Sequence, residues 1–315
     1  MIGGMIIQLR RFFMINPETK DYDKDVCWQY HIREQNFEDD IQDVGFTEDY
    51  VNSLSVSDFE FKQIETDNAK RDIINFIERH EWLGNISQFP THWFGAYHYA
   101  KTKNDFFKKP ILAGALILNL PNAFSKHLGD NTDELERLIS RGACISWSPK
   151  NLASSFIMWS IKWMVDNTRY RLFTAYSDPK ANEIGTIYQA CNFYYLGQNF
   201  GSTERYVNPY TGKVVSDRFF RSRSAYKKYA NELGIDWHRD WSNDQSVLWD
   251  NIPDSLESKI RAKSKKKQKN AKKVYFPPKH KYAYVLGQDK RETKILRRRF
   301  LEINDVYEYP KNRGE

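Results

Sequence analysis

The chain has 315 residues, of which 40% are hydrophobic and 28% are charged, so it can bury a real core and is not a disordered chain. Its formal net charge is +7, and a basic protein most often meets an acidic partner such as nucleic acid. The three cysteines, Cys27, Cys144 and Cys191, lack paired spacing, which excludes a disulfide framework and a cysteine zinc site and is typical of a reducing cytoplasm.

The N-terminal region, residues 1–60, contains no catalytic motif, and we interpret it as an extension that packs on the core. Met5–Leu9 is expected to form a strand. Met1–Met14 is too short and too interrupted by Arg10 and Arg11 for a membrane span, and it lacks a signal-peptide cleavage pattern. We therefore expect a cytoplasmic protein without a membrane partner.

A helix and two strands follow. The spacing of apolar residues predicts an amphipathic helix over Asp67–His80, which the glycine of Trp82-Leu83-Gly84 ends. Thr91–Tyr99 and Pro110–Leu120 are predicted to be antiparallel strands, with a charged hairpin tip at Lys101–Lys109 between them. The second strand is almost continuously apolar, which indicates a central position.

The stretch around the next helix carries the polar residues of greatest interest. A central strand is predicted over Leu135–Ser146, followed by a polar loop and an apolar helix that contains Ile157, Ile161 and Met164 on one face. The N-cap of this helix is either Ser148 or Asn151. A helix start with free N–H groups and hydroxyls attracts anions, although ordinary capping explains the same residues.

Tyr170–Ala175 is predicted to be the next strand, and Pro179 stops it just after Asp178. A short helix over Asn182–Phe193 and a strand over Tyr194–Leu196 complete this part. Apolar elements with polar residues at their junctions are typical of an α/β protein that presents chemistry at strand ends.

Several fragments of this stretch, in this order and spacing, resemble the Mom family of phage DNA-modification proteins and, more broadly, acetyltransferases of the GCN5-related type. They are Glu134-Leu135-Glu136-Arg137, Asn151-Leu152-Ala153-Ser154-Ser155-Phe156-Ile157, Tyr176-Ser177-Asp178-Pro179 and Gly185-Thr186-Ile187-Tyr188-Gln189-Ala190. Weaker similarity extends to His80-Glu81-Trp82-Leu83-Gly84 and to Pro278–Tyr284. Trp82 stands where the family tends to have tyrosine, which puts phenol chemistry there in doubt.

The resemblance implies a GCN5-related acetyltransferase-like α/β fold, with a mixed central sheet flanked by helices over residues 61–223. It also implies transfer of a carbamoylmethyl (acetamido-type) group to the N6 amine of adenine in double-stranded DNA, with the adenine flipped out of the duplex. The catalytic residues carried over are Arg137, Asp178, Tyr176, Tyr188 and Ser155. Those carried over for cofactor binding are Asn151, Leu152, Ala153, Ser154, Gly185 and Thr186.

Arg137 and Asp178 stand at adjoining strand ends, so we expect them to face one another across the opening, either as reacting groups or as a structural ion pair. The fold suggests acetyl-CoA or another CoA-type donor, but the loop Trp147–Ser155 has no glycine, and the sequence does not name the donor. No metal site is expected, because the weak candidates His80 and His92 share no ligand spacing on one element.

The C-terminal region, residues 224–315, is basic and aromatic, and we expect it to contact DNA. A last core strand is predicted over Ser216–Arg223 and a helix over Ala225–Leu233. Lys259–Arg299 then holds seventeen Lys and Arg but two acids, with tyrosines interleaved, as phosphate binding and base stacking require. A solvated tail is the alternative. The DNA-binding candidates are Arg218, Arg221, Arg223, Lys265, Lys266, Lys267, Lys269, Lys279 and Lys281.

Two other functions remain open at this point. One is an acyl-CoA-dependent N-acetyltransferase acting on a small amine or a protein, which would leave the basic region unexplained. The other is a non-catalytic nucleic-acid-binding protein built on this scaffold. The oligomeric state is also open, with a homodimer as one option. For a phage-encoded protein the expected location is the cytoplasm of the host cell.

Overall fold

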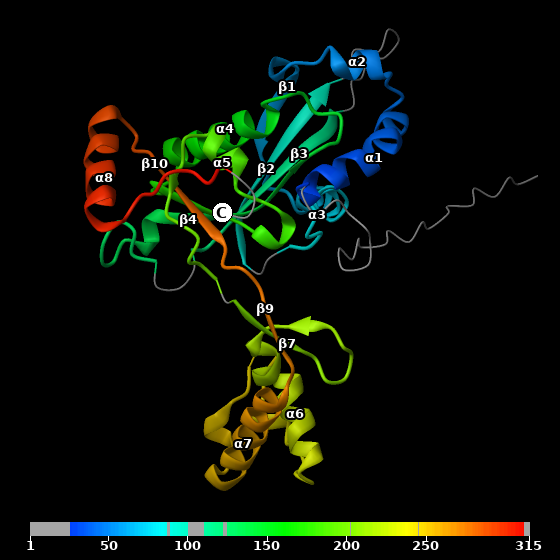
Figure 1. The fold of residues 1–315 in the computed structure, drawn as a ribbon, viewed down its shortest axis with the longest axis vertical. Coiled ribbons are helices and arrows are strands. Elements are labelled where there is room, and N and C mark those ends of the chain that lie inside the picture. The colour runs from blue at the N-terminus through cyan, green and yellow to red at the C-terminus, as the bar shows by residue number, and fades with distance from the viewer. Residues whose placement is uncertain are drawn as a thin grey trace, which may run out of the picture. The chain divides into compact units, whose positions relative to one another are not determined.

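The computed structural model describes residues 26–86, 89–99, 110–121, 125–201, 203–244 and 246–311. The strand expected over Met5–Leu9 and the hairpin tip Lys101–Lys109 lie outside the described residues. The chain forms two compact units, one made of residues 1–200 and 279–315 and the other of residues 201–278 (Figure 1). The second unit is therefore an insertion in the sequence of the first.

The first unit is built on a seven-stranded mixed sheet with the order β1-β2-β3-β4-β5-β10-β6. Among the described strands of this sheet, β4 and β5 are parallel, whereas every other neighbouring pair is antiparallel. The strands are β1 (Phe59–Gln63), β2 (Pro90–Tyr99), β3 (Pro110–Asn119), β4 (Glu136–Cys144), β5 (Leu172–Ser177), β6 (Tyr194–Tyr195) and β10 (His280–Val285). The predicted mixed α/β fold is confirmed.

One face of the sheet is covered by α4 (Leu152–Asn167), with the short α5 (Thr186–Ala190) beside it (Figure 1). Ile161 and Met164 of α4 are almost completely buried against strand residues such as Phe173. Burying an aliphatic side chain of this size contributes about 1.5–3 kcal/mol. The apolar stripe predicted from the sequence is therefore the face that holds α4 on the sheet.

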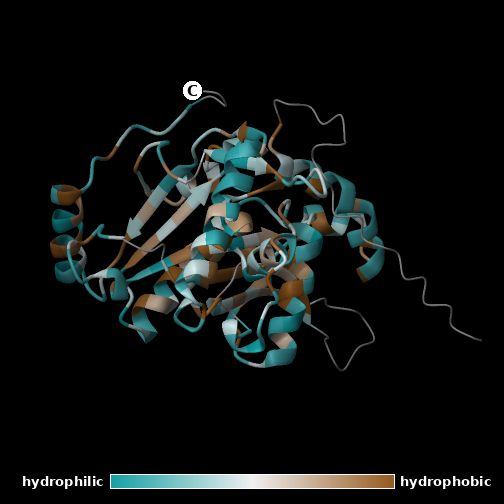
Figure 2. Ribbon diagram, turned by 90° about the horizontal axis from the view of Figure 1, so that it is seen from below, coloured by the Kyte–Doolittle hydropathy of each residue, from teal (hydrophilic) through white to brown (hydrophobic). Residues whose placement is uncertain are grey.

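The opposite face carries the helices α3 (Asp67–His80) and α8 (Lys290–Ile303), each with its own apolar cluster. The N-terminal segment adds α1 (Trp28–Val44), α2 (Glu48–Asn52) and the 3₁₀ helix η1 (Val56–Asp58), whose apolar side chains join the α3 cluster. In Figure 2 the sheet strands are largely white and brown, and teal is concentrated on the helices and loops around them. The 3₁₀ helices η2 (Asp133–Leu135) and η3 (Pro179–Ala181) lead into β4 and away from β5.

The second unit combines a helix pair with a small sheet of order β8-β7-β9. Its core is formed by Tyr226, Tyr229 and Ala230 of α6 against Ile260 of α7. Its strands and helices are β7 (Glu204–Val207), β8 (Val214–Val215), η4 (Asp217–Arg221), α6 (Arg223–Glu232), η5 (Arg239–Trp241), η6 (Trp249–Asn251), α7 (Asp254–Asn270) and β9 (Lys273–Tyr275).

The core strand predicted over Ser216–Arg223 is wrong. Val214–Val215 form a two-residue strand in the small sheet, and a 3₁₀ helix with Phe220 fully buried follows. Ser222 then caps α6 by accepting a hydrogen bond from the Ala225 N–H, so the chain turns into a helix where a strand was expected. The basic side chains of this segment consequently belong to the insertion and not to the central sheet.

The expected boundary at residue 223, between the core and a C-terminal region, differs from the division that the structure shows. The second unit begins at residue 201, and the segment after residue 278 returns to the first unit. There β10 pairs antiparallel with β5, with Tyr282 opposite Ala175, and also pairs with β6. The Tyr282 side chain is fully buried. Residues 280–285 therefore complete the central sheet and are not part of a separate basic region.

Gly185 provides a test of this packing. It has φ +69°, and a Cβ at this position would lie 2.3 Å from the Tyr282 ring. Gly185→Ala should destabilise the protein by about 1–2 kcal/mol through backbone strain and by about another 1–3 kcal/mol through overpacking. Gly45→Ala is a matched control, because Gly45 has the same φ of +69° and no atom within 4 Å of the added Cβ. Equal losses of stability for the two variants in urea denaturation would contradict the packing argument.

Candidate active site and nucleic-acid interface

The two parallel strands of the sheet separate part-way along their length. The β4–β5 ladder runs from Glu136–Leu172 to Ile139–Ala175 and then stops. Beyond that point β4 pairs only with β3, and β5 pairs only with β10. The carboxyl ends of the two strands therefore diverge, which is where ligands bind in open α/β sheets.

A group of side chains lies between the diverging carboxyl ends of β4 and β5, and its first members are next to β4. Glu81 and Trp82 directly follow α3, and the Glu81 Oε2 atom lies 3.5 Å from the Arg141 Nε atom on β4. Arg141 makes its hydrogen bonds elsewhere, donating from Nε to the Asn85 carbonyl at 2.6 Å and from Nη1 to the Ser140 carbonyl at 2.5 Å. Glu81 Oε2 is buried and accepts no hydrogen bond from a described residue.

The same group reaches β5 through a second glutamate. Glu183 accepts a hydrogen bond from the Trp82 indole N–H at 2.8 Å and another from the Asp178 backbone N–H at 3.1 Å. Asp178, the residue after β5, forms an ion pair with Lys279 at 2.8 Å and caps the following 3₁₀ helix through the Lys180 N–H. Glu81, Trp82, Arg141, Asp178, Glu183 and Lys279 are called the carboxylate cluster below.

Burial shifts the protonation of both glutamates. Desolvation raises the pKa of Glu81 to about 8, although Arg141 partly opposes the shift and the charge of Glu183 adds to it. Desolvation also raises the pKa of Glu183 to about 7, against the hydrogen bonds from Asp178 and Trp82, which favour the ionised form. Both carboxyls therefore exchange protons near neutral pH, as groups that act on protons or recognise them do.

Tyr188 of α5 lies beside the two glutamates. Burial raises the pKa of its phenol, and the negative charges of Glu183 and Glu81 raise it further. Its ring packs between Phe193 and Tyr282, with ring centroids 5.4 Å away in each case. Tyr188 is therefore a neutral phenol at physiological pH and can donate a hydrogen bond.

The start of α4 lies next to α5, since the Cys191 thiol contacts the Ser154 carbonyl at 3.7 Å. Asn151 is the residue before the helix and has φ +68°, the left-handed conformation that a glycine would otherwise supply. The N–H groups of Ala153 and Ser154 fall in the first helical turn, where the helix itself offers no acceptor. The residues present thus fit a phosphate group of a CoA-type donor, despite the absence of glycine from the loop.

The loop before α4 is held in place by α1. Arg33 donates to the carbonyl oxygens of Ser146 and Ser148 at 2.9 and 3.1 Å. The Ser146 hydroxyl donates to Asp40 at 2.7 Å. Ser154 donates to the Asn151 carbonyl and Ser155 lies in the first turn, so both predicted serines are at the helix start. Leu152 is instead fully buried, which leaves only its backbone for ligand contact.

The expectation that Arg137 faces Asp178 is wrong. Arg137 lies level with Phe173 near the start of the parallel ladder, whereas Asp178 follows the far end of β5. Parallel strands run in the same direction, so the start of one cannot meet the end of its neighbour. Arg137 is buried, hydrogen-bonded to the Tyr170 hydroxyl, and its guanidinium lies 3.6 Å from the centre of the Tyr170 ring.

The two histidines considered as weak metal ligands lie elsewhere. His80 is buried between α3 and α1, 4.3 Å from the Phe76 ring centre, and desolvation lowers its pKa to about 3, so it is neutral next to Asp40. His92 packs against Tyr170, and burial with the nearby Arg137 charge lowers its pKa to about 4. In the described part of the chain, no three His, Cys, Asp or Glu residues form a metal-binding group.

Four other predicted residues lie at the start of α5, in β5 and in β10. Gly185 and Thr186 begin the five-residue α5, where Gly185 allows close approach of Tyr282. The Tyr176 ring contacts Phe200, and Lys281 lies over it at 5.4 Å. Lys281 is buried and its ammonium contacts His127 Nε2 at 2.5 Å, so its prediction as a phosphate-binding surface residue is wrong. Alternation along β10 turns this lysine inward.

The positive charge of the protein is concentrated in the insertion. Residues 201–278 contain 17 Lys and Arg against 9 Asp and Glu, a net +8, while the whole chain carries +7. The first unit is therefore close to neutral. A compact unit with this charge has the electrostatic character of a nucleic-acid-binding module.

Not all predicted cations of the insertion are available. Lys265, Lys266 and Lys269 are exposed on α7, and no described residue forms an ion pair with them. Lys267 forms an ion pair with Glu232 at 2.9 Å. Arg218 is exposed, whereas Arg221 pairs with Asp217 and Arg223 donates to the Asn243 carbonyl. Lys279 belongs to the carboxylate cluster of the first unit.

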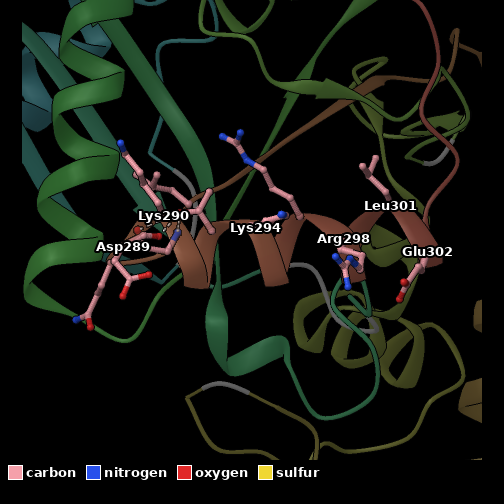
Figure 3. A pocket seen from close by; sticks show the side chains of 11 residues that line it. Asp289, Lys290, Lys294, Arg298, Leu301 and Glu302 are labelled. Atoms are coloured by element: carbon pink, nitrogen blue, oxygen red, sulfur yellow. Dashed lines mark hydrogen bonds between the residues drawn. The ribbon is translucent and has the colours of Figure 1, made fainter.

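A separate open pocket of about 920 Å³ lies along α8 (Figure 3). The basic residues that line it include Lys290, Lys294 and Arg298, beside the apolar Leu301 and the acidic Glu302. It lies at the end of the sheet where β5 begins, because Val285 pairs with Leu172. The carboxylate cluster is at the other end, so this volume does not belong to it.

The sequence did not single out Glu81, Glu183 or Arg141. Glu81 lies in a fragment of weaker family similarity, and Glu183 lies in a region predicted to be helix. A charged residue in the middle of an apolar strand, as Arg141 is, signals a buried partner. That signal was present in the sequence, but the identity of the partner was not.

The family model for the Mom protein family matches residues 58–311. The chain belongs to the Mom protein family. The match includes the sheet, the insertion and α8, whereas the Mom-family region begins after α1 and α2. A search of curated protein sequences finds no significant match.

Solved acetyltransferase structures are similar to this Mom-family protein at low identity. The spermidine N-acetyltransferase from Vibrio cholerae, in complex with CoA and spermine, is 11% identical, with 46% of this chain and 86% of that chain covered and a TM-score of 0.31. A Bacillus subtilis acetyltransferase in complex with CoA is 8% identical, with 72% and 97% covered and a TM-score of 0.30. Within the described ranges, no helix has both the length and the apolar character needed to cross a membrane.

The raised pKa values of the carboxylate cluster predict how stability depends on pH. An unfolded glutamate loses its proton near pH 4.5, while folded Glu81 keeps it until about pH 8. The folded protein binds more protons in this window, so stability should fall as pH rises through it, by up to about 1.4 kcal/mol per pH unit for each such group, and level off above pH 8. Urea denaturation between pH 5 and 9 measures the slope.

Glu81→Gln should flatten that slope, and Glu78→Gln on the exposed side of α3 is the control that leaves it unchanged. Identical slopes in the wild type and Glu81→Gln would show that Glu81 ionises normally.

The free lysines of α7 predict salt-dependent DNA binding. Replacing Lys265, Lys266 and Lys269 together by Gln should lower the slope of log K against log[salt] by up to about 0.9 for each phosphate that the variant no longer neutralises. Lys267→Gln is the control and should change the slope much less, because Glu232 already neutralises this lysine. Fluorescence anisotropy with a labelled duplex over a salt series measures both. An unchanged slope in the triple variant would make this helix face a solvated surface.

Proposed function

We propose that this protein is a DNA-modifying transferase that adds a carbamoylmethyl-type group to the N6 amine of adenine in double-stranded DNA. Membership of the Mom protein family over residues 58–311 is the observation that carries the proposal, because the match includes both the sheet and the basic insertion. A transferase acting on a small amine would have no use for an inserted unit with a net charge of +8.

The carboxylate cluster is the proposed reaction site. An exocyclic amine inside a duplex is out of reach of a buried group, so the target adenine leaves the stack, at a cost of a few kcal/mol that phosphate contacts offset. Lys265, Lys266 and Lys269 supply such contacts in this proposal. In this proposal Glu183 accepts a hydrogen bond from the amine, and the neutral phenol of Tyr188 is a donor nearby.

A CoA-type donor, if used, would be held at the start of α4 by the Ala153 and Ser154 N–H groups, with Asn151 shaping the turn. Such a donor would supply the electrophilic carbon, and its leaving group would depart with the electron pair of the broken bond. The chain itself orients the amine, excludes water and accepts the proton. Arg137 is not assigned to the reaction, since it lies at the other end of β4 with Tyr170.

The test is nucleoside analysis of DNA from cells that express the protein. We expect a new adenine adduct by mass spectrometry, and we expect Asp178→Asn to abolish it. The free energy of unfolding of that variant should lie within about 1 kcal/mol of the wild-type value. Lys279, the ion-pair partner of Asp178, is 39% exposed and can be rehydrated. Asn also retains the capping oxygen for the Lys180 N–H.

Unmodified DNA together with acetylated protein or amine would replace this proposal by an N-acetyltransferase. DNA binding with neither product would make the chain a nucleic-acid-binding protein.

A further inference from the structure

The carboxyl groups of Glu81 and Glu183 in the carboxylate cluster differ in the hydrogen bonds that they accept. This difference indicates which substrate groups they can bind. Glu183 has a partner on each oxygen, since Trp82 donates to Oε1 and Asp178 N–H donates to Oε2. Glu81 Oε2 is buried and accepts no hydrogen bond from a described residue. The two residues are joined through Trp82, which follows Glu81 in the chain and bonds to Glu183.

Two such groups do not both ionise at neutral pH. Like charges held close together in a site of low dielectric share one proton, and the macroscopic titration belongs to the pair. The groups that face the pair are Arg141 from β4, Lys279 before β10, Asp178 after β5 and Tyr188 from α5. Lys279 pairs with Asp178, and Arg141 donates its hydrogen bonds to Asn85 and Ser140. Arg141 also lies 3.5 Å from Glu81 Oε2, where its charge opposes but does not outweigh the desolvation that raises the pKa of Glu81.

The hydrogen bonds decide which carboxyl keeps the proton. Donors that point at both oxygens of Glu183 favour its ionised form, while Glu81 lacks that support at Oε2. The pair therefore presents one O–H donor on Glu81 and one carboxylate acceptor on Glu183, whose oxygens each have a second lone pair. A ligand complementary to this pair of carboxyl groups has a hydrogen-bond acceptor next to an amine that donates.

We propose that Glu81 and Glu183 read the Watson–Crick edge of the flipped adenine, with protonated Glu81 donating to N1 and ionised Glu183 accepting from the N6 amine. This inference rests on the proposed function and names the atoms by which the substrate base is recognised. The same contact leaves an N6 N–H hydrogen-bonded to a carboxylate base.

The donor and acceptor order excludes the bases with the reverse pattern. Guanine and hypoxanthine present N1–H and a carbonyl oxygen, and thymine presents N3–H between two carbonyls. Each would place an N–H against the Glu81 O–H and a carbonyl against the Glu183 carboxylate. Leaving buried polar groups unpaired in this way costs at least about ten-fold in affinity. Cytosine shares the order of adenine, so this contact does not distinguish the two.

The experiment measures binding of dAMP and dIMP by equilibrium dialysis, at pH 7 and pH 9, with melting curves on the same samples. The two nucleotides have the same phosphate and sugar and differ in the base edge. We expect the wild type to bind dAMP at least about ten-fold more tightly than dIMP at pH 7. The preference should shrink at pH 9, where Glu81 loses its proton.

Variants separate recognition from structure. Glu81→Leu should lose the dAMP preference. Glu81→Gln, whose amide N–H replaces the carboxyl O–H, should recover much of it and should no longer respond to the change from pH 7 to 9. Glu183→Gln should weaken dAMP binding at least about ten-fold, because one amide cannot accept from both Trp82 and Asp178. Glu78→Gln is the exposed control on α3.

Equal binding of dAMP and dIMP by the wild type, or an intact preference in Glu81→Leu, would overturn the inference. An adenine adduct made at the wild-type level by Glu81→Leu would also overturn it and would leave the proposed function standing. A clear dAMP preference in a protein that makes no adduct would support the recognition and reject the modification chemistry.

Discussion

The parting of β4 and β5 is the constraint on which the rest of the first unit depends. The two strands share a ladder for four residue pairs and then turn to different neighbours. Their carboxyl ends, the loop before α4 and the turn after β5 consequently meet at one edge of the sheet. The end of α3 lies across this edge and supplies Glu81 and Trp82, so side chains from distant parts of the sequence form one hydrogen-bonded group.

That group is costly to build. Buried carboxyls lose hydration that only hydrogen bonds or nearby cations replace. Glu183 accepts a hydrogen bond on each oxygen, whereas Glu81 Oε2 accepts none from a described residue and has the Arg141 Nε atom 3.5 Å away. The result is a pair of glutamates that titrate near neutral pH next to a neutral phenol. Proteins retain such arrangements where a substrate uses them, since a stable core alone would favour apolar residues.

The two ends of the sheet have different uses. At the end where β5 begins, Arg137 lies on the Tyr170 ring, and His92 makes an edge contact with the same tyrosine. On the α8 side, Lys281 donates to His127, whose other ring nitrogen bonds to Asn304 beyond α8. These contacts tie strands to the covering segments. The N-terminal α1 lies outside the family match, yet Arg33 fixes the loop that starts α4, so residues before the family region shape the candidate donor site.

The sequence by itself determined the elements whose signal is local. The period of the apolar residues predicted α3 and α4, strand-type composition predicted β2 and β5, and an almost continuous apolar run predicted β3. The charge count located a basic region. Tertiary structure decided what depends on pairing between distant segments. Ser216–Arg223 looked like a strand because its composition suits one, but no sheet partner was available, and Ser222 capped a helix. The sequence places β10 in a basic C-terminal region, but in the structure this segment pairs with β5 and β6. The direction of neighbouring strands, which local sequence does not encode, separated Arg137 from Asp178 and brought Glu81 to Glu183.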